Sequence, residues 1–219
     1  FKTYANLDSR TQLCPVRPSN HYHMGGIPTN ADGAVLRPTG ETVPGLFAIG
    51  ECACASFHGF NRLGTNSLLE LLVMGKAAGE GVLACLKDGR IADPPGAGDE
   101  TLSRFSAYLA ARGRENTGRI RLEMRDMMTK KVGVFRNERG MREAVAALEE
   151  YRRRSAGAAV ATQGLRSNQE LLERWELDNL LDVAMMIAQG AIMRQESRGA
   201  HFREDFPERR DAFQFHTIA

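Results

Sequence analysis

The chain has 219 residues, 42% of them hydrophobic and 26% charged, with a formal net charge of +2. This is an ordinary globular composition, long enough for one large domain or two small ones, and so small a charge argues against nucleic-acid binding. No apolar run reaches the roughly 18 residues of a membrane span, so any membrane association would be that of a peripheral subunit. The start, FKTYANLDSR, is neither a signal nor a transit peptide, and Phe1 stands where an initiator Met would be, which indicates the interior of a longer protein.

Residues 1 to about 65 are rich in glycine, proline and short β-prone runs. Ala34-Val35-Leu36 is a candidate strand that follows a turn at residues 30–33. Val43-Pro44-Gly45 predicts a second turn, and residues 46–50 predict a short buried strand that ends at a glycine.

The clearest helix of this half covers residues 67–88. Ser67 and Glu70 match a capping box, in which each side chain accepts a hydrogen bond from a free amide at the helix start. Apolar residues recur at spacings of three and four, as expected for the packed face of a buried helix. They are Leu69, Leu72, Val73, Val82, Leu83 and Leu86. Residues 93–98 predict a linker.

Residues 99 to about 206 have a helical pattern throughout. We expect helices over residues 101–111, from residue 120 onward, over 141–154 and over 169–195. The last of these has a wide apolar face. Three or four antiparallel helices of this kind predict a bundle, with methionines filling its core.

Four cysteines are few for this length and predict free thiols in a reducing compartment rather than a disulfide framework. Cys52, Cys54 and His58 are possible metal ligands by type, but a structural zinc site needs four ligands, usually with wider cysteine spacing. Small buried thiols beside a backbone turn are the favoured interpretation, and no metal is predicted. The cysteines are Cys14, Cys52, Cys54 and Cys85.

Two polar, glycine-bearing segments carry more chemistry than packing requires. In the first, HYHMGGIPT at residues 21–29, the paired glycines Gly25 and Gly26 allow positive φ and close approach of a bulky ligand. His21, four residues earlier, can hydrogen-bond an anion. A tight turn with two exposed imidazoles is an equally good interpretation of these residues alone.

The second segment begins at Gly50-Glu51, where the predicted strand ends, and continues at residues 61–64. A glutamate in that place can accept from a ribose or ribityl hydroxyl. Arg62 can offer a bidentate fork to a carboxylate. Ser67 opens the helix, so the amides of Ser67 and Leu68 would be free donors backed by the helix dipole. The alternative makes Arg62 a surface ion-pair residue.

Three long motifs carry a family resemblance. In the order HYHMGGIPT, GLFAIGECACASFHGFNRLGTNSLLE and QESRGAHFREDFPER, they resemble the flavoprotein subunit of succinate dehydrogenase and fumarate reductase. The resemblance spans nearly the whole chain but only the C-terminal part of that subunit. L-aspartate oxidase has similar segments, but Met24 and Leu63-Gly64 favour the succinate and fumarate branch. The chain has no G-x-G-x-x-G fingerprint for a pyrophosphate.

The resemblance implies roles for individual residues. His21 and Arg62 would hold the two carboxylates of the dicarboxylate substrate, succinate or fumarate. No catalytic residue is expected here, because the proton-shuttle arginine and the histidine that attaches FAD lie in parts of the family that this chain lacks. The residues expected to bind FAD are Gly25, Gly26, Gly50, Glu51, Asn66, Ser67 and Leu68.

The resemblance also implies an assembly. In the family, hydride passes between the dicarboxylate and flavin N5, and electrons then pass to an iron–sulfur subunit bound to a membrane anchor, and on to quinone. We therefore expect a peripheral subunit on the cytoplasmic face of the bacterial inner membrane. The expected fold is α/β plus all-α. Residues 1–19 would end a substrate-capping domain, 20–95 would be the C-terminal part of an FAD-binding (Rossmann-like) domain, and 96–219 would form an antiparallel helical bundle.

Two other functions stay open at this point. An L-aspartate oxidase-like flavoenzyme would share the motifs but act on L-aspartate. A non-enzymatic interaction module, in which the charged helices dock a partner, becomes preferable if the full-length protein carries no flavin.

The charged segment from Gln195 to Asp205 follows the longest predicted helix, and Gly199 can stop that helix. One interpretation makes His201 and Arg203 catalytic. We favour a network of ion pairs that locks the helical domain onto the flavin domain, because charged residues at helix ends more often cap and pair.

Overall fold

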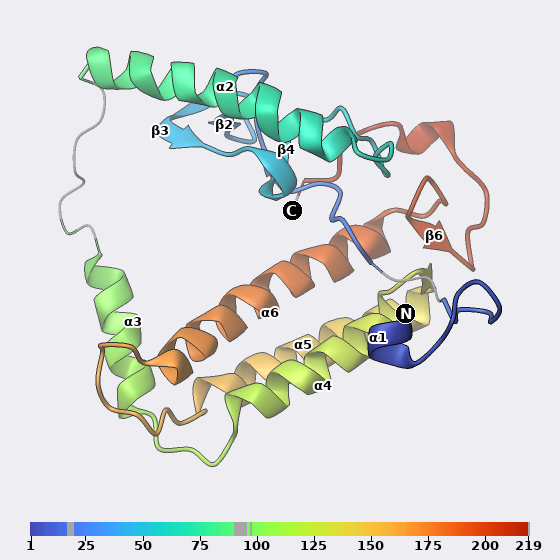
Figure 1. Cartoon of the computed structure of the whole chain (residues 1–219). Helices are drawn as coiled ribbons and strands as arrows, with labels where there is room; N and C mark the ends of the chain where they lie inside the picture. The colour runs from blue at the N-terminus through green and yellow to red at the C-terminus, as the bar shows by residue number, and fades with distance from the viewer. Residues whose placement is uncertain (17–19, 90–95, 97, 219) are drawn as a thin grey trace.

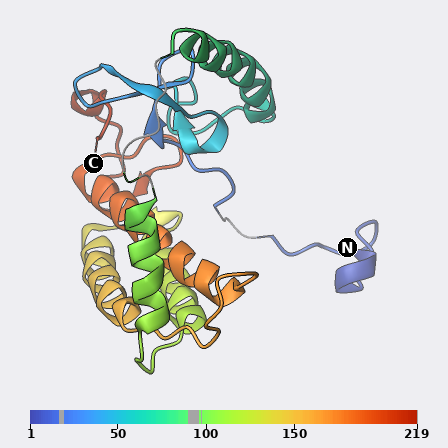
Figure 2. The same ribbon diagram turned by 90° about the vertical axis from the view of Figure 1, so that its left-hand side faces the viewer.

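The computed structural model describes residues 1–16, 20–89, 96 and 98–218. Figure 1 shows one long helix lying over small strands in the upper part and a group of packed helices below. A one-turn helix, α1 (Lys2–Ala5), buries none of its residues and stands away from the rest of the protein in Figure 2. None of the described helices is long and apolar enough to cross a membrane.

The upper part consists of short strands, a 3-10 turn and helix α2. The elements are β1 (Ile27–Pro28), β2 (Ala34–Leu36), β3 (Thr42–Phe47), η1 (Gly50–Cys52), β4 (Ala53–Cys54) and α2 (Asn66–Lys87). Strands β1 and β4 pair in parallel, and β2 and β3 pair antiparallel. The described residues contain only two-stranded sheets, so the Rossmann-like assignment stays a prediction while the mixture of helices with small sheets is established.

Strand β2 and the turn before it form as predicted. The side chain of Asn30 accepts from the amides of Asp32 and Ala34, and Gly33 has a φ of 73°. The second predicted turn is wrong, because Val43-Pro44-Gly45 lies inside β3. The antiparallel register shifts along this pair, and Gly45 takes a φ of 74°, as a bulge requires.

Helix α2 buries a different face from the one its apolar spacing predicts. Its buried residues are Glu70, Met74 and Ala78. A Cβ on Gly81 would lie 2.8 Å from the Phe47 ring, so this narrow face approaches β3 closely. The predicted apolar stripe is mostly exposed, with Leu72 at 73%. The small strands are too narrow to cover the rest of the helix.

The lower part is helical, as predicted, and its description as an antiparallel bundle stays a prediction. Its elements are α3 (Asp99–Ala110), α4 (Thr117–Lys131), β5 (Phe135–Arg136), α5 (Glu138–Ala156), α6 (Gln169–Met193), β6 (Phe202–Arg203) and the 3-10 turn η2 (Asp211–Phe213). The side chains of Asn116, Asn137 and Asn168 accept an amide at the starts of α4, α5 and α6, which explains where these helices begin. Of the predicted linker, residues 93–95 and 97 lie outside the described residues.

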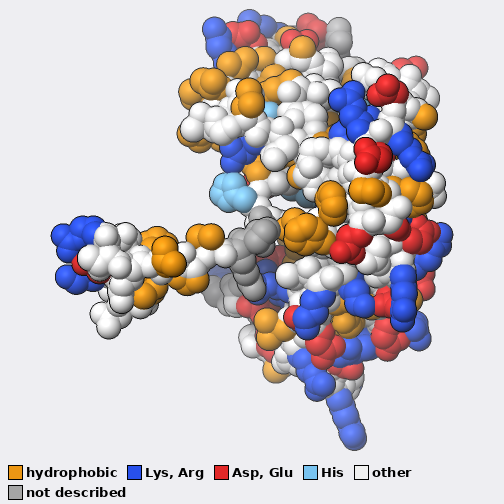
Figure 3. Space-filling model, turned by 90° about the vertical axis from the view of Figure 1, so that its right-hand side faces the viewer, with side chains coloured by type: hydrophobic (Ala, Val, Ile, Leu, Met, Phe, Trp, Pro, Cys, Tyr) orange, Lys and Arg blue, Asp and Glu red, His pale blue; other side chains and the backbone are white. Residues whose placement is uncertain are grey.

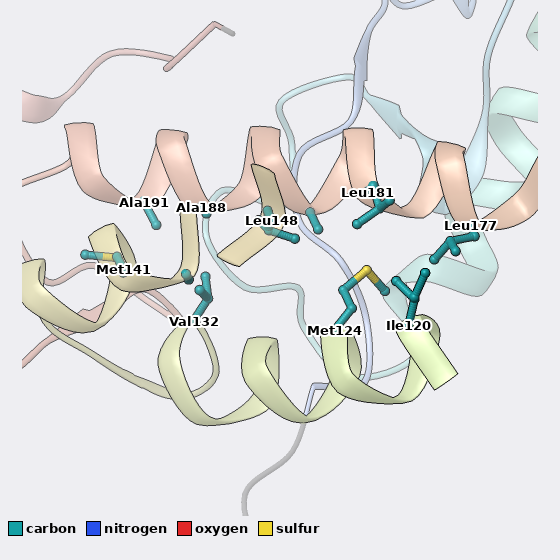
Figure 4. Close-up of a cluster of buried hydrophobic side chains, with 11 residues drawn as sticks. Ile120, Met124, Val132, Met141, Leu148, Leu177, Leu181, Ala188 and Ala191 are labelled. Carbon is teal, nitrogen blue, oxygen red and sulfur yellow. The ribbon is translucent and has the colours of Figure 1, made fainter. Parts of the chain in front are cut away.

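The largest buried cluster lies between α4, α5 and α6 (Figure 4). Ile120 and Met124 come from α4, Leu148 from α5, and Leu177 and Leu181 from α6. The methionine prediction holds for Met124 and in part for Met127, Met128 and Met185, which pack against this cluster. It is wrong for Met186 and Met193, which are exposed.

Candidate functional site

Arg62 lies in the loop before α2, next to the ring of Tyr22. The guanidinium carbon is 4.9 Å from the ring centroid, a distance at which the cation is attracted to the ring face. The Nε atom of Arg62 is buried without a hydrogen-bond partner, and no carboxylate among the described residues pairs with the side chain. The surface ion pair offered as an alternative is therefore not observed, and the unpaired fork suits an anionic ligand.

The neighbouring segment exposes His21 and His23, as the turn interpretation expects. The structure shows no direct contact between His21 and Arg62. It is Tyr22, between the two histidines, that connects this segment to the arginine. The Tyr22 hydroxyl donates to Oε2 of Glu70 at 3.0 Å. Burial, reinforced by that hydrogen bond, raises the pKa of Tyr22 to about 12, so the hydroxyl stays a proton donor at neutral pH.

Glu70 does not form the predicted capping box. The helix begins at Asn66, its N-cap Thr65 makes no side-chain cap, and Ser67 lies inside the first turn. Glu70 points inward, with 2% of its side chain exposed, and its Oε2 also lies 2.8 Å from Nε2 of His58. Tyr22 and His58 therefore donate hydrogen bonds to this carboxylate, in place of the backbone amide that the capping box predicted as its donor.

The start of α2 offers fewer free amides than predicted. The Leu68 amide donates to the Thr65 carbonyl at 2.9 Å, and the Asn66 amide donates to the Leu63 carbonyl at 3.1 Å. Among the described residues the Ser67 amide has no backbone acceptor, so it is a donor that a ligand could use.

The three predicted cofactor glycines differ in what surrounds them. A Cβ on Gly26 would lie 2.4 Å from the Cys52 carbonyl oxygen, and one on Gly50 would lie 2.6 Å from Leu71. Packing against the backbone thus requires glycine at Gly26, whereas at Gly50 the contact is with the end of a flexible side chain and the φ of 70° is what favours glycine. Gly25 has a φ of 97° and nothing within 4 Å of its Cβ position, so a ligand could approach there. Glu51 accepts the His23 amide at 2.8 Å, which joins the two motif segments.

The cysteine prediction is partly wrong. All four cysteines are free, but Cys52 is exposed rather than buried. It does lie in a turn, where its thiol donates to the Ile49 carbonyl at 3.3 Å. The described residues contain no cluster of three or more potential metal-ligating side chains.

The segment after α6 holds the loop that carries Arg62. The Ala200 amide donates to the Phe60 carbonyl at 3.2 Å, and the Arg194 guanidinium carbon lies 4.7 Å from the Phe60 ring centroid. A Cβ on Gly199 would come within 2.7 Å of the Phe60 side chain. The helical part therefore touches the site two residues before Arg62.

The ion pairs predicted for this segment form, but they join residues of the helical part to one another, and the contact with the loop before α2 is made through Phe60 instead. Glu196 is fully buried and pairs with Arg194 at 2.7 Å and with Arg198 at 2.9 Å. Burial opposes ionisation, but hydrogen bonds from Arg198, the Arg210 amide and Arg194 hold the pKa of Glu196 down at about 2. Arg203, also fully buried, pairs with Asp205 and with Glu138 of α5, at 2.7 and 2.9 Å.

His201 sits inside this network rather than at an open surface. Burial, followed by the charges of nearby arginines, lowers its pKa to about 4. Arg136 can only donate, so the 2.9 Å contact makes Nδ1 of His201 an acceptor. Nε2 then carries the proton and donates to the Arg194 carbonyl at 3.1 Å. A neutral imidazole with both nitrogens engaged supports a structural role.

Sequence reasoning missed three side chains of the site. Tyr22 lies between two histidines that have the stronger ligand pattern, His58 fits only the pattern of a metal ligand, and Glu70 fits that of a helix cap. The one signal in the sequence is Glu70, a charged residue within an apolar helical run. Such a residue can pair with a buried partner as readily as it can cap the helix.

Comparison with known proteins covers both parts of the fold. Residues 121–219 match the family model described as fumarate reductase flavoprotein C-term, and residues 2–68 match that of an FAD binding domain. The succinate dehydrogenase flavoprotein subunit of Coxiella burnetii is 40% identical over 215 residues, which are 95% of this chain and 37% of that protein. The fumarate reductase flavoprotein subunit of Helicobacter pylori is 38% identical over 202 residues, covering 90% of this chain and 27% of that protein.

A solved structure of a mutant E. coli quinol fumarate reductase FrdA superposes with a TM-score of 0.86 and 35% identity, over 97% of this chain and 36% of that one. The chain is similar, along its whole length, to the C-terminal part of the succinate dehydrogenase and fumarate reductase flavoprotein. The resemblance seen in the three motifs is thereby confirmed. The chain spans under two fifths of the length of these flavoproteins.

Proposed function

We propose that this chain supplies the C-terminal part of an FAD-dependent subunit that interconverts succinate and fumarate. The observation that carries the proposal is Arg62, whose buried Nε is unpaired and whose guanidinium rests on the Tyr22 ring. An arginine held in place but not neutralised is suited to bind a carboxylate. His21, exposed in the adjoining segment, would bind the second carboxylate of the substrate.

The FAD-binding role rests on features from three segments. Gly25 has a positive φ with open space around its Cβ position, Glu51 lies in the 3-10 turn η1, and the Ser67 amide lacks a backbone acceptor among the described residues. Bound FAD would supply the two-electron redox chemistry, while these residues bind and orient the cofactor. Gly26 and Gly50 would contribute indirectly, because they let the supporting loops pack closely.

The exposed face of α2 supports a place within a larger subunit. Figure 3 shows hydrophobic side chains gathered on the upper part of the molecule, where α2 lies, and mixed charges over the helices below. An apolar surface of this kind usually has a partner. The N-terminal part of the FAD-binding domain would cover it. The exposed residues of this face are Leu68, Leu69, Leu71, Leu72, Val73, Leu83 and Leu86.

Within that subunit, residues 1–19 would end the substrate-capping domain, residues 20–95 would belong to the FAD-binding domain, and residues 96–219 would form the helical domain. The relatives are flavoprotein subunits of succinate dehydrogenase and fumarate reductase. By similarity to these relatives, the partners of the subunit would be an iron–sulfur subunit and, through it, a membrane anchor. The site of action would be the cytoplasmic face of the bacterial inner membrane.

The test is an assay of the complete subunit that carries this chain, purified with its iron–sulfur partner. Succinate oxidation is measured with an artificial electron acceptor, in parallel with L-aspartate oxidation and with the flavin content. We expect bound FAD and turnover of succinate but not of L-aspartate. Turnover of L-aspartate alone would establish the aspartate oxidase instead, and a flavin-free protein would establish the interaction module.

A further inference from the structure

Glu70 is a buried carboxylate that the proposed function does not use. The other buried residues of its helix, Met74 and Ala78, are apolar. A carboxylate in such a position is costly unless donors satisfy it. Here one donor comes from each of the two loops that carry the proposed substrate residues, Tyr22 from residues 20–26 and His58 from residues 55–65.

These contacts fix the orientation of the Tyr22 ring. The hydroxyl is bonded to Glu70, and the ring lies nearly perpendicular to the His58 imidazole, at 83° with 5.8 Å between the ring centroids. Glu70 is in turn fixed by helix α2 and by His58. With one end anchored, the ring presents its face to the Arg62 guanidinium.

The helical bundle contains the same side-chain types in a different arrangement. The Tyr108 hydroxyl donates to Asp178 at 2.6 Å, and the Arg174 guanidinium carbon lies 4.5 Å from the Tyr108 ring centroid. There Arg174 also donates to Asp178 at 2.5 Å, so the carboxylate neutralises the arginine that the ring supports.

Around Tyr22, the carboxylate of Glu70 does not pair with Arg62. Glu70 is occupied by Tyr22 and His58, and none of the described carboxylates pairs with Arg62. The ring attracts the cation through its quadrupole and leaves its charge in place. An arginine that is already oriented and still charged loses less freedom when a carboxylate binds.

We infer that Tyr22 is the positioning residue for Arg62, and that Glu70 and His58 anchor its ring so that Arg62 is held without being neutralised. This inference rests on the proposed function, in which Arg62 binds a substrate carboxylate. The experiment uses the complete FAD-loaded subunit and the variants Tyr22→Leu, Tyr22→Phe and Tyr108→Leu.

Tyr22→Leu removes the ring, and we expect the KM for succinate to rise about tenfold, with FAD still bound and with a smaller change in kcat. Tyr22→Phe keeps the ring but loses its hydrogen bond to Glu70, so KM should rise by about threefold, and a wild-type KM in this variant would refute the anchoring role of Glu70. Tyr108→Leu is the matched control, and it should lower Tm while KM stays at the wild-type value. A wild-type KM in Tyr22→Leu, or an equal rise in Tyr108→Leu, would overturn the inference.

A second measurement does not depend on turnover. Phenylglyoxal modifies accessible arginines, and mass spectrometry reports the rate at Arg62. We expect that rate to increase severalfold in Tyr22→Leu and to change little in Tyr22→Phe and Tyr108→Leu. An unchanged rate in Tyr22→Leu would contradict the inference even if the subunit acts on another substrate, whereas a wild-type subunit that does not oxidise succinate would refute the proposed function alone.

Discussion

At the scale of single residues, the site is defined by which charges are paired and which are not. Glu70 and Glu196 are both deeply buried, and each is satisfied by more than one donor. Arg62 is the contrast, because an aromatic ring rather than a carboxylate supports it. This difference distinguishes the buried charges that stabilise the fold from the arginine that is proposed to bind substrate.

Replacing Arg62 with Lys tests the proposed anchor directly. Lysine keeps the charge but loses the planar fork, so a carboxylate can no longer be bound in bidentate fashion. We expect succinate turnover to fall at least about a hundredfold, with FAD content unchanged. Arg121→Lys, which alters an exposed pair with Glu176, is the control and should behave as wild type. Near-normal turnover in Arg62→Lys would rule out the anchoring role.

His201 provides a prediction about pH. Its folded-state pKa of about 4 lies below the ordinary value of 6.5, so the unfolded chain binds the proton more readily. This contribution to stability is complete above pH 6.5 and is lost as pH falls toward 4; the shift corresponds to about 3 kcal/mol. Tm measured against pH should therefore decline less steeply in His201→Gln over this range. Parallel curves for the two proteins would show that His201 is not neutral in the fold.

At the scale of elements, the segment after α6 joins the two parts of the protein. Its buried arginines, Arg194 and Arg203, bond to backbone carbonyls and to acids of the helical part. Its small residues, Gly199 and Ala200, contact Phe60 in the loop that leads to Arg62. We therefore expect the arginines of this segment to stabilise the helical part, and Gly199 and Ala200 to position the loop that leads to Arg62.

Arg198→Ala tests the stability role. Glu196 would lose a paired donor but keep Arg194, so the melting temperature should fall. Thermal unfolding measures this loss, and the KM for succinate should be nearly unchanged. A protein of wild-type stability with a much higher KM would place Arg198 in the substrate site instead.

Gly199→Ala tests the geometric role. Gly199 has a φ of 58°, and its added Cβ would meet the Phe60 side chain at 2.7 Å. We expect the loop to shift and the KM for succinate to rise severalfold, because Arg62 lies two residues away. Gly164→Ala, where nothing lies within 4 Å, is the control. Equal KM values in Gly199→Ala and Gly164→Ala would show that the contact between Gly199 and Phe60 does not affect substrate binding.

At the scale of the whole molecule, the chain holds one side of a proposed flavin site beside a large uncovered helix. Residues 1–219 produced alone should bind no FAD and show no succinate turnover, because nothing in the sequence provides a pyrophosphate cradle. The absorbance spectrum of the purified chain, together with an activity assay, measures both. A yellow, active protein would refute the proposed division of the subunit.

Local sequence patterns are enough to predict the helices, the strand at Ala34–Leu36 and the motifs around His21 and Arg62, and those motifs lead to the related flavoproteins. Helix periodicity and turn chemistry involve only a few neighbouring residues, so they can be recognised from a short stretch of sequence. Tertiary structure decided which face of α2 is buried, that Val43-Pro44-Gly45 is strand, and that Glu70 points inward. Each of these depends on partners far away in the chain. Tyr22 and Glu70 are 48 residues apart, and Arg136 and His201 are 65 apart, so only the folded chain brings their hydrogen-bonding groups together.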